Sequence, residues 1–109
     1  MPSFEEYQTK TGETAIYPKE HGLVYTALGL TNEAGEVAGK VKKLIRDNNF
    51  QLTFEFVEAI SGEIGDVLWY LARLADELGL SLNDIAQDNL NKLSDRRDRE
   101  VLGGSGDKR

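Results

Sequence analysis

The sequence predicts an all-α protein, a helical bundle of two long and two short helices that is completed by oligomerisation. Three observations point to this class. Both prolines, Pro2 and Pro18, lie at the start of the chain, so no later position forbids a helix interior. Apolar residues recur at helical spacing through two long segments. Side chains that cap helix N-termini precede the two short segments.

The first short helix is expected to begin after Ser3, because Ser3 and Glu6 form a capping box. It ends before the extended connector at Tyr17-Pro18. The first long helix is expected over residues 23–46, where apolar side chains follow the helical period until a polar Asp-Asn-Asn run breaks it.

The second long helix is expected over residues 53–78, with Gly79 as its stop. Ser81, followed three residues later by Asp84, caps a last helix over residues 82–97. Because the chain has 109 residues and shows no internal repeat, we expect one domain over residues 1–102. Residues 103–109 form a flexible Gly-rich tail, either a frayed end or a lid whose basic residues reach a ligand.

Composition excludes several classes of function. With 13 Lys and Arg against 19 Asp and Glu, the net charge of −6 disfavours nucleic-acid binding. The absence of Cys and the presence of 1 His exclude a thiolate nucleophile and a His-rich metal site within one chain. Carboxylates remain, and they favour Mg²⁺ or Mn²⁺. No apolar run is long enough to span a membrane, and the N-terminus lacks the pattern of a signal peptide. We therefore expect a cytoplasmic protein without a membrane partner.

Two four-residue motifs pair carboxylates on one helix face, Glu33-x-x-Glu36 on the first long helix and Glu63-x-x-Asp66 on the second. At about 100° per residue, both pairs lie on the same edge of the apolar stripe of their helix. If the two helices pack antiparallel through these stripes, the four carboxylates converge beside the core. Single pairs of this kind are usual on acidic surfaces, but two pairs in the same register are not.

Convergence is costly without a ligand, because two like charges about 4 Å apart repel by about 4 kcal/mol at an effective dielectric constant of 20. A divalent cation removes this repulsion. The sequence therefore predicts a metal site made of Glu33, Glu36, Glu63 and Asp66. We expect Mg²⁺ as the cofactor, with Mn²⁺ as a substitute.

Polar and basic side chains border this acidic edge and suit a polyphosphate. Some of them are equally consistent with a solvated surface. Tyr70 lies on the carboxylate edge, where it could pack on a base or ribose or only cap the rim of the core. The candidate substrate-binding residues are Lys40, Lys43, Tyr70, Asn89, Lys92 and Arg96.

Trp69 lies on the opposite side of its helix from the apolar stripe, together with Gly62 and Gly65. This position predicts a second packed surface, formed by another helix or another subunit. Glycines inside helices cost about 1 kcal/mol each relative to Ala. We therefore expect close helix approach at Gly35, Gly39, Gly62 and Gly65.

The two acidic motifs and their surroundings, Leu28-Gly-Leu-Thr-Asn-Glu-Ala-Gly-Glu-Val37 and Gly65-Asp-Val-Leu-Trp-Tyr-Leu71, resemble the MazG-like family of all-α nucleoside triphosphate pyrophosphohydrolases. Asn89-x-x-Lys92-Leu93 resembles the fourth-helix motif of that family, and the ending Gly104-Ser-Gly-Asp107 is similar to the tails of small members, phage ones included. The resemblance covers about residues 23–97.

The resemblance implies Mg²⁺-dependent hydrolysis of a nucleoside triphosphate to the monophosphate and pyrophosphate, in helical subunits that form a homodimer or homotetramer. It also implies that the four carboxylates bind metal and that one of them orients the water. Lys43 and the fourth-helix residues would bind phosphates. Such a reaction proceeds by in-line attack of water on the α-phosphorus. A non-catalytic helical interaction module and a nucleotide-binding sensor remain alternatives.

Overall fold

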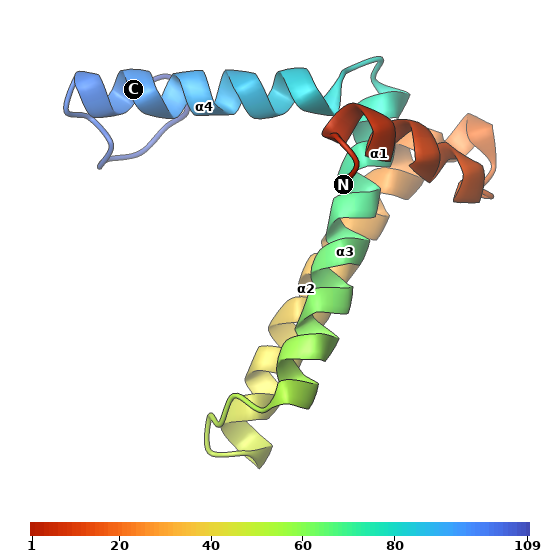
Figure 1. The fold of residues 1–109 in the computed structure, drawn as a ribbon, viewed down its shortest axis with the longest axis vertical. Helices are drawn as coiled ribbons and strands as arrows, with labels where there is room; N and C mark the ends of the chain where they lie inside the picture. Colours follow the sequence, from red (N-terminus) through yellow and green to blue (C-terminus); the bar gives the residue numbers. More distant parts are fainter.

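A computed structural model describes all residues, 1–109, and is built from four α-helices without a strand. Helices α2 (Gly22–Asp47) and α3 (Phe54–Glu77) run antiparallel as one long hairpin, shown in Figure 1 in orange to yellow and in green. Their ends lie within one residue of those expected from the sequence. The prediction of an all-α fold with two long and two short helices is confirmed. None of the helices has the length and apolarity that crossing a bilayer requires.

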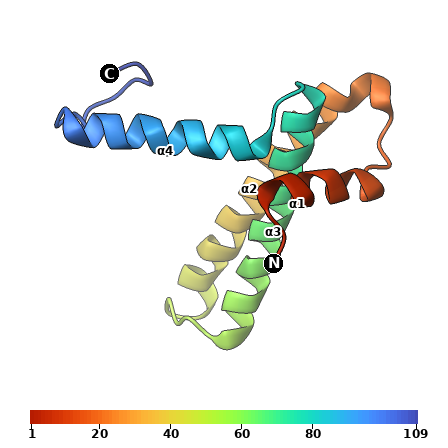
Figure 2. The same cartoon turned by 45° about the horizontal axis from the view of Figure 1, so that its top comes forward.

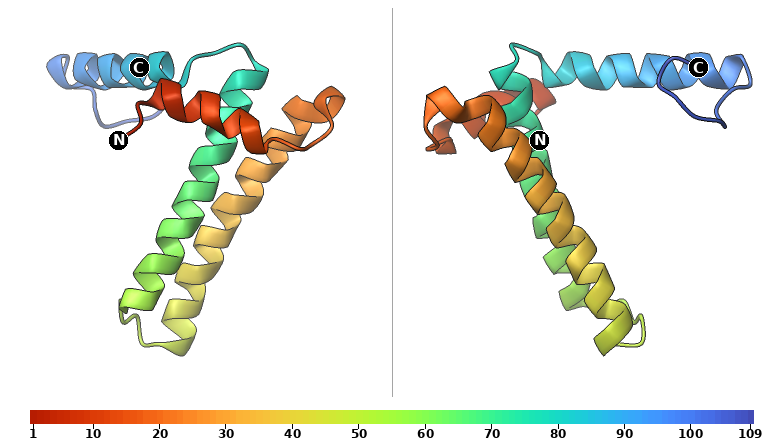
Figure 3. Two further views of the ribbon diagram at one scale, coloured as in Figure 1. Left: turned by 45° about the vertical axis from the view of Figure 1, so that its right-hand side comes forward. Right: turned by 180° about the vertical axis from the view of Figure 1, so that it is seen from behind.

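Helix α1 (Phe4–Thr11) lies across the end of the hairpin where α2 begins and α3 ends, as Figure 3 shows. The Ser3 hydroxyl accepts a hydrogen bond from the Glu6 backbone N–H, so the expected cap forms. A 3-10 turn, Gly12–Thr14, and a second one, Lys19–His21, connect α1 to α2. Residues 11–21 make this connection and are called the N-terminal segment below.

Gln8 ties α1 to the turn between α3 and α4. Its buried side chain donates to the Leu80 carbonyl at 2.8 Å and accepts from the Leu82 backbone N–H at 2.8 Å. The Leu80 carbonyl and the Leu82 N–H have no hydrogen-bond partner in a helix. The two bonds from Gln8 therefore spare the protein the free-energy cost of burying them unpaired. Gly79 takes the positive φ of 69° at which the chain turns after α3.

Helix α4 (Leu82–Asp98) leaves the hairpin at this turn and projects away from it, which Figure 2 shows from a second side. The tail doubles back beside α4, where Asp107 pairs with Lys92 at 2.6 Å and with Arg96 at 3.3 Å. Arg109 donates to the backbone carbonyls of four preceding residues, so the last residues form a closed loop.

The chain is extended rather than compact. Its radius of gyration is 16.9 Å, against about 13 Å for a compact domain of roughly 100 residues. Its accessible surface is 8077 Å², against about 6,000 Å² for a folded monomer of this mass. Only 11 of 109 residues are buried, and many large apolar side chains on all three longer helices are exposed. The apolar stripes of the hairpin are therefore only partly covered by the chain itself.

Close approach between helices occurs at glycines other than those expected. No atom lies within 4 Å of a Cβ built at Gly35, Gly39, Gly62 or Gly65, so the expectation for these four is wrong for contacts inside the chain. At Gly29, in contrast, the Cβ would overlap the ring of Tyr70. Gly29 is the position where α2 admits an aromatic side chain from α3.

Replacement of Gly29 by Ala is expected to push the Tyr70 ring away from α2 and to lower the thermal unfolding temperature, because the rigid ring overlaps the added methyl group. The matched control is Gly35→Ala, which adds the same methyl group into open space. That control gains about 1 kcal/mol of helix propensity and is expected to unfold at a higher temperature. Equal melting temperatures for the two variants would contradict the packing at Gly29.

Candidate metal centre

Three carboxylates gather at the middle of the hairpin. Glu33 comes from α2, and Glu63 and Asp66 come from α3, one turn apart. One oxygen from each lies within 4.8 Å of the oxygens of the other two. Glu33 and Glu63 are half-buried, and Asp66 is exposed. These three residues are called the acidic cluster below. The two motifs therefore converge, as the common register of the two helices leads one to expect.

The electrostatics of the acidic cluster are unfavourable without a cation. The pKa of Glu33 is raised above its ordinary value, first by desolvation and then by a hydrogen bond with Glu63 and the negative charges of Asp66, Glu63 and Glu36. A raised carboxyl pKa means that the folded protein resists ionising this group. The arrangement is therefore suited to a positive charge between the helices.

Glu36 does not belong to the acidic cluster. It follows Glu33 by three residues on α2 and is exposed, and none of its oxygens reaches the other three carboxylates. Its charge is nevertheless close enough to raise the pKa of Glu33. Lys40, one turn further along α2, lies beside the cluster instead, with its Nζ atom 3.7 Å from a Glu63 oxygen. Lys43 is exposed one turn beyond Lys40 and makes no ion pair.

A cavity of about 330 Å³ opens directly beside the acidic cluster. Glu33 and Asp66 form one side of it, and Trp69, Tyr70 and Thr14 form the rest. Tyr70 thus lies at the carboxylate edge as expected, with its ring over Gly29. The cavity joins a negatively charged wall to an aromatic one.

The sequence did not identify Trp69 or Thr14 as site residues. The Trp69 indole N–H donates to the Thr14 hydroxyl at 2.9 Å, so the segment that follows α1 packs on the outer face of α3. The sequence predicts that another helix or another subunit covers this face; within the chain Trp69 instead meets a 3-10 turn, and no other part of the chain lies against Gly62 and Gly65. The available signal was the indole N–H on a face away from the core, since a Trp N–H usually finds a hydrogen-bond partner.

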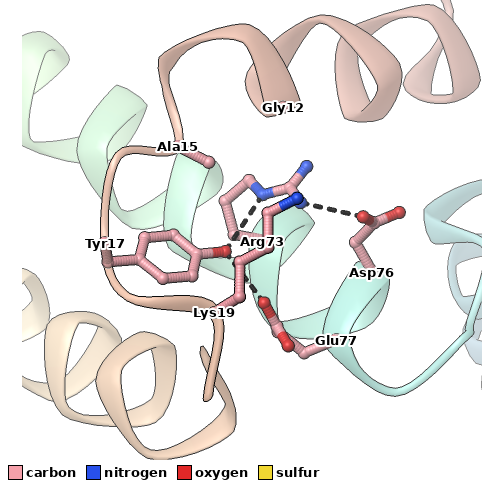
Figure 4. A pocket seen from close by; sticks show the side chains of 7 residues that line it. All are labelled: Gly12, Ala15, Tyr17, Lys19, Arg73, Asp76 and Glu77. Atoms are coloured by element: carbon pink, nitrogen blue, oxygen red, sulfur yellow. Dashed lines mark hydrogen bonds and ion pairs between the residues drawn. The ribbon is translucent and has the colours of Figure 1, made fainter. Parts of the chain in front are cut away.

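Arg73 fixes this segment on α3. Figure 4 shows its guanidinium between the Tyr17 ring and Asp76. It donates to the Tyr17 hydroxyl at 3.4 Å, to the Thr11 hydroxyl at 3.2 Å and to Asp76 at 2.8 Å. The Tyr17 hydroxyl in turn donates to Glu77 at 3.1 Å. Because the buried Arg73 side chain bonds to both Thr11 and Tyr17, the chain on either side of Thr14 is held against α3.

The fourth-helix candidates lie elsewhere. Asn89, Lys92 and Arg96 are on α4, which runs away from the hairpin in Figures 1 and 2, so the structure does not bring them to the acidic cluster of the same chain. Lys92 and Arg96 instead share one ion-pair partner, Asp107. Hydrogen bonds from Lys92 and then Arg96 lower the pKa of Asp107.

The residues present fit a hard divalent ion. The acidic cluster supplies only oxygen donors, from two helices, and the carboxylates are close enough to share a ligand. Lys40 is the single basic side chain that forms an ion pair with the cluster, and at 3.7 Å it does not neutralise all three charges. The donor set matches Mg²⁺ or Mn²⁺ and is unsuited to a soft metal.

The fold and this site define a class: helical-hairpin proteins with a carboxylate cluster suited to a divalent ion next to a ligand cavity. Residues 24–101 match the family model described as the MazG nucleotide pyrophosphohydrolase domain. The chain is 47% identical over 109 residues to the "Gene 37 protein" of Mycobacterium phage L5, covering 94% of this chain and 96% of the phage protein. No solved structure gives a significant match. The protein belongs to the MazG nucleotide pyrophosphohydrolase family.

Proposed function

We propose that the protein is a Mg²⁺-dependent nucleoside triphosphate pyrophosphohydrolase of the cytoplasm, which releases the nucleoside monophosphate and pyrophosphate and so controls the nucleotide pool. The observation that carries this proposal is the acidic cluster, with three carboxylate oxygens from two helices within 4.8 Å, in a domain of the MazG family. The adjoining cavity of about 330 Å³ offers room for part of a nucleotide.

In this proposal Glu33, Glu63 and Asp66 hold the metal. Glu36 lies on the same face of α2 and completes the ligand set as a fourth carboxylate. When bound, the ion lowers the pKa of a water and neutralises phosphate oxygens. A carboxylate of the set that is not engaged with the ion would orient the attacking water toward the α-phosphorus and accept its proton.

Basic side chains are needed for the pyrophosphate leaving group. Lys40 is beside the acidic cluster, and Lys43 lies one turn further along α2. Within one chain Asn89, Lys92 and Arg96 are too far along α4 to assist (Figure 1). We therefore propose a homodimer or homotetramer in which α4 of one copy reaches the cluster of another. The extended shape and the exposed apolar side chains support assembly.

Removal of the Asp107 charge is expected to strengthen phosphate binding at Lys92 and Arg96, because Asp107 occupies the same donors that a phosphate would use. For Asp107→Asn we expect about threefold tighter binding of pyrophosphate by calorimetry, the scale of one partly exposed ion pair. Asp98→Asn, which removes an equal charge paired only with Arg97, is the control. Weaker binding by Asp107→Asn would mean that Asp107 positions the two cations instead.

The activity is tested with a panel of ribo- and deoxyribonucleoside triphosphates, scored for pyrophosphate and orthophosphate with and without Mg²⁺. Release of pyrophosphate only when Mg²⁺ is present supports the proposal. Stabilisation of the protein by triphosphates without any product would identify a nucleotide-binding sensor instead. Absence of both binding and product across the panel would leave the interaction module as the function.

A further inference from the structure

The cavity beside the acidic cluster has a division that matches the two ends of a nucleotide. Its negatively charged side, Glu33 and Asp66, faces the place proposed for the metal and the phosphates. Its other side is aromatic and is made by Trp69 and Tyr70 from consecutive positions of α3. The two rings meet edge to face, with centroids 5.0 Å apart and planes at 85°. A flat aromatic group can therefore lie against one ring while the other ring borders its edge.

The orientation of Trp69 is set by residues outside the hairpin. The indole N–H is used by the Thr14 hydroxyl, which itself donates to the Thr11 carbonyl at 3.2 Å. The opposite side of the indole meets the Tyr17 ring edge to face, at a centroid distance of 6.4 Å. The polar atom of the indole thus has a partner within the protein, and what the half-buried side chain offers to a ligand is its π surface.

Arg73 donates to the hydroxyls of Tyr17 and Thr11. The Thr14 hydroxyl donates to the Thr11 carbonyl, so the partner of the Trp69 indole is fixed to α3. Thr14 and Tyr17 also precede the part of the chain that matches the family model, which begins at residue 24. The support of the aromatic wall is consequently a feature of the N-terminal segment, whereas Trp69, Tyr70 and the carboxylates proposed to bind metal lie within the matched residues.

We propose that Trp69 and Tyr70 bind the base of the nucleotide and that Thr14 is a positioning residue, because its hydrogen bond fixes the plane of the indole. The inference rests on the proposed function for the position of the phosphates. Aromatic side chains stack on any base, since every base has a π face. The ligand class is therefore a nucleotide with an aromatic base, in preference to an inorganic polyphosphate.

Trp69 is the only tryptophan, so its fluorescence reports on this wall alone. The experiment titrates the full-length protein, in Mg²⁺, with a deoxynucleoside triphosphate and, separately, with inorganic tripolyphosphate. We expect the nucleotide to quench the emission and tripolyphosphate to leave it nearly unchanged. Equal responses to the two ligands would overturn the proposal.

The role of Thr14 is tested with Thr14→Val, which keeps the shape of the side chain and removes its hydroxyl. We expect KM for nucleotides to rise about fivefold, the scale of one hydrogen bond, with kcat little changed. The control is Thr9→Val, the same substitution at an exposed position of α1. An unchanged KM for nucleotides in Thr14→Val, or an equal change in kcat, would overturn the role of Thr14.

A second variant, Trp69→Leu, removes the π surface without relying on Thr14. It is expected to weaken nucleotide binding in calorimetry and to leave tripolyphosphate binding unchanged, and equal weakening of both ligands would count against base binding. Failure of this inference is distinct from failure of the proposed function. Pyrophosphate release without a change in Trp69 fluorescence would contradict only the proposal that Trp69 and Tyr70 bind the base. Quenching by nucleotide alone, without hydrolysis, would support the wall and contradict the hydrolase.

Discussion

Asp66→Asn is expected to abolish Mg²⁺-dependent pyrophosphate release, with kcat lowered by about 1,000-fold or more. Asp66 is one of the three carboxylates whose oxygens lie within 4.8 Å, so its loss leaves the acidic cluster with two charges. Steady-state kinetics at saturating Mg²⁺ measure the effect. The helical content by circular dichroism should not change, because Asp66 is exposed and makes no hydrogen bond within the hairpin.

The same substitution is expected to stabilise the protein in EDTA. The raised pKa of Glu33 stabilises the fold at low pH, where this carboxyl is protonated, and that stability is lost as pH rises from the ordinary value of 4.5 through the raised one. Because the charge of Asp66 contributes to the raised pKa of Glu33, Asp66→Asn should reduce the loss of folding stability as pH rises. Melting temperatures measured against pH in EDTA would show a smaller decline.

The control for both effects is Asp88→Asn, the same chemical change at an exposed position of α4 that takes part in no ion pair. It should retain hydrolysis and the pH dependence of the wild type. Hydrolysis by Asp66→Asn at the wild-type rate would show that the reaction does not use the acidic cluster.

The second large effect is expected on assembly. Four apolar residues recur every seven positions along α3 and its C-terminal cap, and their exposed fractions are 39–57%. They are Val57, Ile64, Leu71 and Leu78. A row at this spacing is typical of a face that packs on another helix. Ile64→Gln combined with Leu71→Gln is expected to reduce the molar mass in light scattering to that of one chain, 12.1 kDa.

Hydrolysis by the dissociated double variant should fall as well, since Lys92 and Arg96 would no longer meet the cluster of another copy. Ile16→Gln serves as the control, because Ile16 is 94% exposed in the N-terminal segment and does not belong to the row of four apolar residues. A wild-type protein that is monomeric at working concentration and fully active would contradict the shared site.

The helices were predictable because their signals are local. Ser3, Thr53 and Ser81 each accept a backbone N–H three residues on, and the apolar spacing between such caps defines the helical segments. The convergence of Glu33 with Glu63 and Asp66 also follows from the sequence, since both motifs occupy the same register of antiparallel helices.

The position of Glu36 was not predictable in the same way. Angles of 100° per residue give the edge of the stripe, but the rotation of one helix against the other decides which carboxylate faces the partner helix. In this hairpin Glu33 faces α3 and Glu36 points to solvent, with Lys40 against Glu63. Packing between the helices therefore brings three of the four predicted carboxylates together and leaves Glu36 outside the acidic cluster.

The contribution of the N-terminal segment and the direction of α4 could not be predicted either. Thr14 lies in an irregular segment, and no periodicity shows where such a segment packs. The course of α4 depends on the turn at Gly79 and on the hydrogen bonds of Gln8, which join residues more than 70 positions apart. Within one chain no helix approaches Gly35, Gly39, Gly62 or Gly65, because an exposed helix face tolerates glycine without a neighbour, at a cost of about 1 kcal/mol. The approach of another subunit to these glycines stays a prediction.

The most direct measurement is a crystal structure with Mn²⁺ and a non-hydrolysable nucleoside triphosphate, in which anomalous scattering locates the ion. We predict a peak between α2 and α3, coordinated by Glu33, Glu63 and Asp66 with Glu36 as the fourth carboxylate, and the triphosphate at the same ion. Anomalous density at another place in every subunit, or a triphosphate bound away from these carboxylates, would contradict the proposed centre.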